Sequence, residues 1–237
     1  MNAHPASLGT SALLGAGAVL VWNDVTAEGR TPFYEWHDKE HIPERLAIPG
    51  FRRGRRYAKP GHSPEWLTFY EADDLEVLVS PGYTARLNAP TPATVEALKH
   101  FLNTSRAVCR VVASVGSSSG GHVLAMRLEA AANGESVRRY LTEDVFPRVA
   151  STVGVLACHL FSADPPASHL NTAESRTRAF DVPSWVLLVE ASTEEAAVSA
   201  QRLINGPDLQ RLGVSVRSDA AIYALEICRL AQPTPSP

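Results

Sequence analysis

FYEWHDKEHIPERLAIPGFRRGRRY, which spans residues 33–57, contains a helical segment, a corner and a strand. The same framework returns later, because counting 104 positions forward from Pro43 and Gly50 reaches Pro147 and Gly154. A proline near the end of a helix and a glycine at the following corner stop the helix and turn the chain into the next element. The sequence therefore contains two copies of one structural unit.

The two copies differ in the polarity of one helix face. At the offset of 104, His37 and His41 of the first copy correspond to Leu141 and Val145 of the second. Residues four apart lie on the same side of a helix, and a side that one copy fills with aliphatic residues is expected to face the core. A buried ionisable group needs a partner or a function. The asymmetry predicts a functional site in the first copy.

Each copy shows the order strand, helix, strand, strand, helix, strand. In the first copy we expect strands at 18–25, 51–58, 66–71 and 106–115, and helical segments at 31–41, 75–87 and 95–102. In the second copy we expect strands at 123–130, 155–162, 185–190 and 220–230, and helices at 136–150 and 193–204. The predicted fold class is α+β, with two tandem ferredoxin-like βαββαβ units that pack sheet to sheet as an intrachain dimeric α+β barrel.

The domain boundaries follow from this order and from composition. Residues 1–115 are expected to form the N-terminal unit, 116–121 (GSSSGG) a flexible linker, 122–231 the degenerate C-terminal unit and 232–237 a tail. The offset between the copies grows from 104 to 119 positions because the loop from Asp164 to Asp181 has fifteen more residues in the second copy. A polar loop of that length predicts either a lid or disorder.

Composition limits the classes of partner and the compartment. A net charge of -3 over 237 residues gives no electrostatic reason to expect nucleic acid. The apolar run at 13–22 is too short to span a bilayer, and no basic residue precedes it as in a signal peptide, so we expect no membrane partner and a cytoplasmic protein. The three cysteines, at 109, 158 and 228, are too scattered for a disulfide framework and are expected to be buried free thiols.

The sequence from residue 33 to 57 resembles the EthD-like branch of the dimeric α+β barrel superfamily. His41-Ile42-Pro43 matches the H-x-P histidine of the first helix, and Pro49-Gly50-Phe51 matches the corner that leads into the second strand. The resemblance covers about residues 18–115, and the second half only through the repeat. It implies a fold shared by cofactor-free monooxygenases, lactone isomerases, polyketide cyclases, haem enzymes and proteins without known activity, so the fold alone does not choose the function.

His41 and His37 are the candidate catalytic residues. Histidine exchanges a proton near neutral pH, which suits enolisation, isomerisation or ring closure of a carbonyl compound, and the alternative for both is a structural histidine with a satisfied hydrogen bond. The run from His37 to His41 also matches the H-x-x-E-H pattern of some zinc peptidases, but Pro43 follows too soon for the long helix of those enzymes. We therefore expect no metal.

The candidate substrate-binding residues are polar side chains of the first copy: Asn23, Tyr34, Arg55, Tyr57 and Tyr70. The hydroxyls of Tyr57 and Tyr70 have no counterpart in the second copy, which carries Phe161 and Val189 there. Arg55 belongs to a run of arginines on the second predicted strand, and alternation places Arg53 and Arg55 on one face. Such arginines bind either a substrate carboxylate or enolate or, the interpretation we prefer, form ion pairs with Glu40, Glu44 and the acidic Asp73 and Asp74 region.

These residues predict a cofactor-independent enzyme of the isomerase, cyclase or monooxygenase type that acts on a small hydrophobic carbonyl or aromatic metabolite. One alternative is a non-catalytic protein that binds a small ligand or assists a pathway. Another is a haem-binding enzyme with one histidine as axial ligand. No glycine-rich phosphate loop is present, so nucleotide cofactors are not expected. A homo-oligomer is compatible with the sequence.

Overall fold

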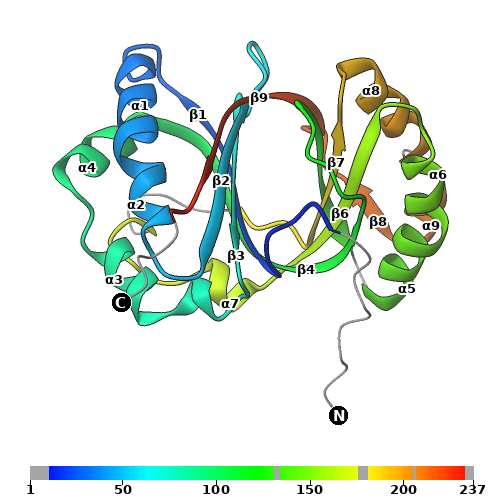
Figure 1. Ribbon diagram of the computed structural model, residues 1–237, viewed down its shortest axis with the longest axis horizontal. Coiled ribbons are helices and arrows are strands. Elements are labelled where there is room, and N and C mark those ends of the chain that lie inside the picture. Colours follow the sequence, from blue (N-terminus) through cyan, green and yellow to red (C-terminus); the bar gives the residue numbers. More distant parts are fainter. Residues whose placement is uncertain (1–10, 131–133, 176–180, 205–206, 233–237) are drawn as a thin grey trace. The chain divides into compact units, whose positions relative to one another are not determined.

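The computed structural model describes residues 11–130, 134–175, 181–204 and 207–232, and these form two compact units (Figure 1). The first-copy unit consists of Leu14–Arg110, Ala163–Val182 and Glu226–Pro237. The second-copy unit consists of Met1–Leu13, Val111–Ser162 and Pro183–Leu225. This division differs from the contiguous boundaries expected from the sequence, since the segment from residue 163 to 182 belongs with the first copy.

The first-copy unit has the predicted order of elements. They are β1 (Gly17–Val25), α1 (Arg30–Trp36), the π-helix η1 (His37–His41), α2 (Ile42–Leu46), β2 (Phe51–Ala58), β3 (Trp66–Ala72), the 3₁₀ helix η2 (Val77–Val79), α3 (Pro81–Asn88), α4 (Pro92–Leu98) and β4 (Phe101–Val115). The bounds expected before and at the last strand were wrong, because the helix expected at 95–102 spans Pro92–Leu98 and the strand expected from 106 already begins at Phe101. The last five residues of β4 lie in the second-copy unit.

The second copy repeats this order. Its elements are β5 (His122–Ala130), α5 (Gly134–Arg139), the π-helix η3 (Tyr140–Val145), α6 (Phe146–Ala150), β6 (Val155–Ala163), α7 (Pro165–Ser168), β7 (Trp185–Ala191), α8 (Glu194–Ile204), α9 (Pro207–Arg211), β8 (Val214–Val216) and β9 (Ala221–Leu230). The short elements α7, α9 and β8 were not predicted. The α+β class and the two tandem ferredoxin-like units are confirmed.

Both copies widen the same helix by a π-turn. In the first copy the turn is η1, which begins at His37, and in the second it is η3, whose Leu141 is the counterpart of that histidine. A π-turn inside a helix is uncommon and often lies at a functional site. Because the apolar copy has it as well, the π-turn belongs to the shared framework, and the polar side chains on it are what distinguish the first copy.

The register of β1 brings polar residues of the first-copy unit into one row. Val21 pairs with Thr68 of β3 on one side and with Arg106 of β4 on the other, and both pairings are antiparallel. The next row on the same face joins Tyr70, Val19 and Val108. Since side chains alternate between faces, Thr68, Arg106 and Tyr70 all stand on the face that carries Val19 and Val21.

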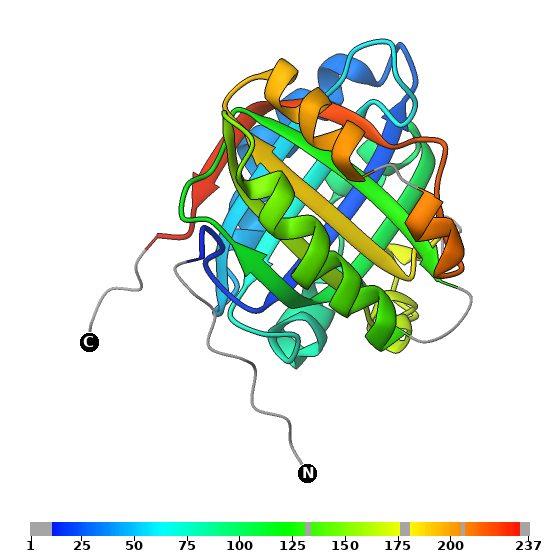
Figure 2. The same cartoon turned by 90° about the vertical axis from the view of Figure 1, so that its right-hand side faces the viewer.

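The helices of the second-copy unit cover a uniformly apolar sheet face. Figure 2 shows α5, α6 and α8 lying across the strands of that unit. Leu141, Val145 and Val149 of the η3–α6 segment are at most 1% exposed and pack in one hydrophobic cluster with Leu187 and Val189 of β7. This copy therefore fills with aliphatic carbon the positions where the first copy has histidines.

Two of the three cysteines are buried as predicted. Cys109 and Cys158 lie inside their strands, but Cys228 is exposed, so the prediction was wrong for that thiol. It lies in the second half of β9, where residues on both faces are partly or fully exposed. No helix of the described ranges is long and apolar enough to cross a membrane.

The glycines at the two corners have backbone angles that other residues rarely adopt. Gly50 has φ of 93° and Gly154, its counterpart, has φ of 85°. A Cβ on Gly50 would in addition lie 2.5 Å from a methyl carbon of Val77. Replacing Gly50 with alanine is expected to lower the free energy of unfolding by about 2–4 kcal/mol, from strain and steric overlap together.

Urea unfolding of Gly50→Ala and of Gly61→Ala would measure this effect. Gly61 also has a positive φ, of 78°, but nothing lies within 4 Å of the position of its missing Cβ. The control therefore carries the backbone strain without the overlap, at a cost of about 1–2 kcal/mol. Equal losses in the two variants would contradict the assigned contact with Val77.

Candidate functional site

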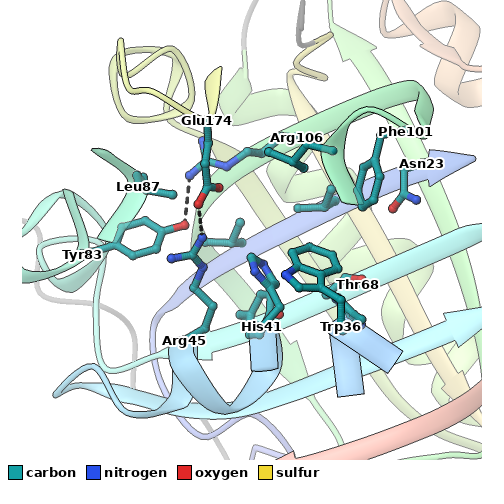
Figure 3. A pocket seen from close by; sticks show the side chains of 15 residues that line it. Asn23, Trp36, His41, Arg45, Thr68, Tyr83, Leu87, Phe101, Arg106 and Glu174 are labelled. Atoms are coloured by element: carbon teal, nitrogen blue, oxygen red, sulfur yellow. Dashed lines mark hydrogen bonds and ion pairs between the residues drawn. The ribbon is translucent and has the colours of Figure 1, made fainter. Parts of the chain in front are cut away.

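A cavity of about 60 Å³ lies in the first-copy unit, between the sheet face of β1, β3 and β4 and the helices above it. Helices α1, η1, α2, α3 and α4 all contribute lining side chains, and Glu174 closes one side (Figure 3). Such a volume holds a few water molecules, while an apolar cavity that binds benzene is about 150 Å³. The cavity therefore suits a molecule with few non-hydrogen atoms.

Three polar side chains project into this cavity from one helix face. His37 and His41 of η1 and Arg45 of α2 follow one another at intervals of four residues, and all three line the cavity. The sequence analysis identified the two histidines but missed the arginine. The same comparison of copies contains the signal, because Arg45 corresponds to the buried Val149 at the offset of 104.

The tautomer of His37 follows from its neighbour. Its Nδ1 lies 3.0 Å from Nη1 of Arg56, and a guanidinium only donates hydrogen bonds, so Nδ1 accepts and Nε2 carries the proton. Burial lowers the pKa of His37 well below the ordinary histidine value, and the positive charges of Arg56 and Arg45 lower it further. His37 is therefore a neutral imidazole that offers an N–H donor from Nε2.

His41 lies between two rings on the cavity wall. Its ring centroid is 4.3 Å from that of Trp36 and 5.6 Å from that of His37. Figure 3 shows the imidazole of His41 next to Trp36 and close to the guanidinium of Arg45. Unlike the buried His37, His41 is partly exposed, so it is the histidine better placed to exchange a proton with a bound molecule.

Arg45 is held by a carboxylate from a distant part of the chain. The arginine is 2% exposed, and its Nη2 donates to Oε1 of Glu174 at 2.5 Å. Glu174 belongs to the loop from Asp164 to Asp181, for which the sequence predicted a lid or disorder. Its backbone N–H also donates to the carbonyl of Leu87, at 3.2 Å, so this part of the loop is fastened to the first-copy unit. Residues 176–180 of that loop lie outside the described residues.

Arg106 lies on the opposite side of the cavity from His41 in Figure 3. Its Nη2 donates to the hydroxyl of Tyr83 at 3.2 Å, and its Nη1 donates to the carbonyl of Ser168 at 3.2 Å. Neither Arg106 nor Tyr83 was predicted as a site residue. The position of Arg106 on β4 became apparent only with the register of β1, which the sequence does not give.

Tyr70 is brought to the cavity by a glycine on the neighbouring strand. Gly54 pairs with Tyr70, and a Cβ on that glycine would lie 2.9 Å from the tyrosine ring. Burial raises the pKa of Tyr70 strongly, so the hydroxyl stays protonated. Within the described part of the chain this hydroxyl has no hydrogen-bond partner. Asn23, a second predicted residue, also lines the cavity.

Three of the predicted residues lie away from the cavity. The hydroxyl of Tyr34 donates to Glu226 at 2.6 Å. Arg55 donates to Glu71 at 2.9 Å and stacks on Phe69, and Tyr57 follows it on the same strand face. That face of β2 is opposite to the one of Gly54 and Arg56, which border the cavity side. The structure thus brings together Asn23, His37, His41 and Tyr70 and leaves Tyr34, Arg55 and Tyr57 outside.

The arginines of β2 form ion pairs, which is the interpretation we preferred. Glu71 accepts from both Arg53 and Arg55, and Asp73 accepts from Arg52. Glu40 and Glu44 were the wrong partners. Glu40 accepts a hydrogen bond from Thr91, and Glu44 pairs with Arg45 and Arg86 at 3.9 and 3.7 Å.

The cavity does not fit a haem. Cofactors and drug-sized ligands fill pockets of roughly 300–1,000 Å³. This cavity is far smaller, and both histidine rings are packed against aromatic neighbours. The described residues also contain no group of three or more His, Cys, Asp or Glu side chains that could hold a metal ion. The glutamate of the H-x-x-E-H pattern, Glu40, bonds Thr91 instead.

His159 of the second copy is part of a buried hydrogen-bonded set. Its Nδ1 lies 2.8 Å from Oγ of Ser114, and its Nε2 lies 3.2 Å from Oε1 of Glu190. Glu190 and His159 correspond to Glu71 and Arg55 of the first copy. Because His159 is 0% exposed, its role is in the packed interior of the second-copy unit, where a ligand cannot reach it.

Comparison with known proteins gives likenesses in structure. No protein-family model and no curated protein matches the sequence. An anthrone oxidase-like protein has a TM-score of 0.61 at 13% identity, with 94% of this chain and 96% of that chain covered. A chlorite dismutase from Candidatus Nitrospira defluvii has a TM-score of 0.54 at 10% identity, with 90% and 91% covered. A haem-binding protein from Thermus thermophilus has a TM-score of 0.52 at 10% identity, with 90% of both chains covered.

At identities of 13% and below, these likenesses concern the fold alone. The structures span nearly the full length of this chain and of their own, so both copies take part in each match. The chain shares with these structures an α+β fold of two ferredoxin-like units in one polypeptide.

Proposed function

We propose that the first-copy cavity is the active site of a cofactor-independent enzyme of the EthD-like branch, of the isomerase or cyclase type, which moves a proton on a small carbonyl compound. One observation carries the proposal. His37, His41 and Arg45 face a cavity at positions where the second copy packs aliphatic side chains into its core. Polar groups that a folded framework does not need for stability are candidates for function.

The geometry supports a division of roles between the histidines. His37 is kept neutral, with its N–H on Nε2, so it is suited to donate a hydrogen bond to a carbonyl oxygen that becomes an enolate. His41, on the partly exposed side, is suited to take the proton from the adjacent carbon and return it elsewhere. Trp36, Leu87 and Phe101 supply the apolar part of the cavity wall.

The cavity volume limits the size of the possible substrates. About 60 Å³ favours a small aliphatic carbonyl compound over an aromatic one, unless the loop that carries Glu174 moves. Structural relatives include an anthrone oxidase-like protein and a chlorite dismutase, so proteins with this fold differ in their chemistry. The reaction therefore has to be inferred from the side chains of the site. We expect the protein to act in the cytoplasm, with a small molecule as its partner, and no nucleic acid or membrane.

Deuterium exchange tests this proposal without knowledge of the natural substrate. 2-Butanone and related small ketones in D₂O exchange their α-hydrogens when a base and an oxyanion donor act together, and proton NMR measures the rate. The native protein is expected to accelerate the exchange of at least one such ketone. His41→Val, which installs the second copy's residue, should slow it by about 10²–10⁴-fold while the unfolding midpoint changes little.

His169→Gln is the matched control, because His169 is exposed and lies outside the cavity. It should exchange the ketone at the native rate. Full activity in His41→Val would remove that residue from the mechanism. If no ketone exchanges with the native protein, the non-catalytic ligand-binding alternative replaces the proposal, and a Soret band in the purified protein would favour the haem alternative.

A further inference from the structure

Two buried hydrogen-bond donors of the cavity wall lack an acceptor. Nη1 of Arg45 and the hydroxyl of Tyr70 are both buried and have no hydrogen-bond partner among the residues that the structure describes. The Glu44 carboxylate lies 3.9 Å from Nη1, which is beyond hydrogen-bond distance. An unmet buried donor is costly, and a cationic one more so. A bound molecule with a hydrogen-bond acceptor would therefore satisfy two donors that the described residues leave without one.

A third donor belongs to the same wall. Because Nδ1 of His37 accepts from Arg56, its Nε2 carries a hydrogen, and the described residues give that N–H no acceptor. The cavity thus has a guanidinium N–H, a phenol O–H and an imidazole N–H among its lining groups. Such a set matches an oxyanion better than a neutral carbonyl, which has one oxygen and no charge.

The lining has one more cationic side chain than acidic ones. Arg45 and Arg106 are its cationic side chains, and Glu174 is its acidic one. The hydrogen bond from Arg45 to Glu174 uses Nη2. Nη1 has the Glu44 carboxylate at 3.9 Å but no hydrogen-bond partner among the described residues, so it can still donate to a second carboxylate. Arginine commonly binds carboxylates through two N–H groups in this way.

We propose that the substrate of this cavity is a small carboxylate, such as a short oxo acid, whose carboxylate binds Nη1 of Arg45 and the hydroxyl of Tyr70. The inference rests on the proposed function, since it names the substrate class of the same site. The carboxylate would hold the molecule by one end and leave its reactive carbon to the histidines. A molecule of five or six non-hydrogen atoms is of the size that the cavity volume favours.

Propanoate and propanamide form the test pair, because they have nearly the same shape and differ in charge. Their binding to the full chain is measured by isothermal titration or by NMR line broadening, at constant ionic strength. The native protein is expected to bind propanoate at least about 10-fold more tightly than propanamide, as one charge-assisted hydrogen bond implies. Equal binding of both probes, or binding of neither, would overturn the inference.

Variants locate the binding. Tyr70→Phe removes a hydroxyl without a partner and should fold normally, yet it should lose about 5–10-fold in affinity for propanoate. Arg45→Gln should abolish the preference for propanoate. Arg110→Gln is the control, since Arg110 is exposed, pairs with an exposed glutamate and does not line the cavity. Native affinity in Tyr70→Phe together with native preference in Arg45→Gln would place the anion elsewhere and overturn the assignment.

The binding assay tests the substrate class and the exchange assay tests catalysis, so a negative result in one does not imply a negative result in the other. His41→Val should keep its preference for propanoate while it loses ketone exchange. Absence of exchange in the native protein, with propanoate selectivity intact, would remove the catalytic proposal and leave a carboxylate-binding protein. Ketone exchange by a native protein that does not prefer propanoate would support the catalytic proposal and contradict the inference that the substrate is a carboxylate.

Discussion

Replacing Glu71 with leucine is expected to lower the free energy of unfolding by about 3–5 kcal/mol. Glu71 is 1% exposed and accepts hydrogen bonds from Arg53, from Arg55 and from the backbone N–H of Leu14. Without it, the guanidinium groups of two buried arginines lose their shared carboxylate. Removal of one partner from a buried ion pair is costly because a charge remains in a poorly solvated place.

The Arg52–Asp73 pair provides the control for this variant. It lies on the same two neighbouring segments, but its side chains are 52% and 39% exposed. Asp73→Asn should change the free energy of unfolding by no more than about 1 kcal/mol, as for surface ion pairs in general. Urea unfolding of both variants compares the two sites. Similar losses would mean that burial does not set the contribution of these pairs.

A second large effect is expected on lowering the pH, and it comes from His37. Burial, together with the charges of Arg56 and Arg45, holds the pKa of His37 well below the ordinary value. Below that ordinary value the unfolded chain takes up a proton at this position and the folded chain does not. Stability therefore decreases as the pH falls, by about 1.4 kcal/mol for each pH unit, until the pKa of the folded state is reached.

Urea unfolding of the native protein and of His37→Leu between pH 7.5 and 4.5 isolates this term. The variant has the second copy's residue and no titrating group there, so its stability should depend less steeply on pH below the ordinary histidine pKa. His169→Gln, which removes an exposed histidine, should leave the pH dependence close to native. An identical slope for His37→Leu and the native protein would refute the depressed pKa.

Much of the fold was accessible from the repeat. The strand at 51–58 has the predicted bounds, and β1, β3, β5, β6, β7 and β9 differ from prediction by one residue at an end. Alternation also assigned Arg53 and Arg55 correctly to one face of β2. It did not say which face looks toward the helices, and for that reason Arg55 and Tyr57 were placed in a cavity that they do not line.

The site shows where inference from one sequence stops. Arg45 was within reach, because its counterpart Val149 marks it in the same way as the two histidines are marked. Glu174 was not, since it lies 129 positions after Arg45 in a loop that is fifteen residues longer than its counterpart in the first copy. No periodicity, spacing or repeat links those two residues. Only the folded chain shows that they meet.

The origin of Glu174 has a bearing on how the duplicated halves depend on each other. The counterion of Arg45 comes from a loop of the second copy that is fifteen residues longer than its counterpart in the first. A fragment that ends at residue 115 would keep both histidines but would lack Glu174, so the guanidinium of Arg45 would lose the carboxylate that pairs with it. The first half alone therefore lacks a residue of its own site, and a protein made only of that half would need another acidic residue near Arg45.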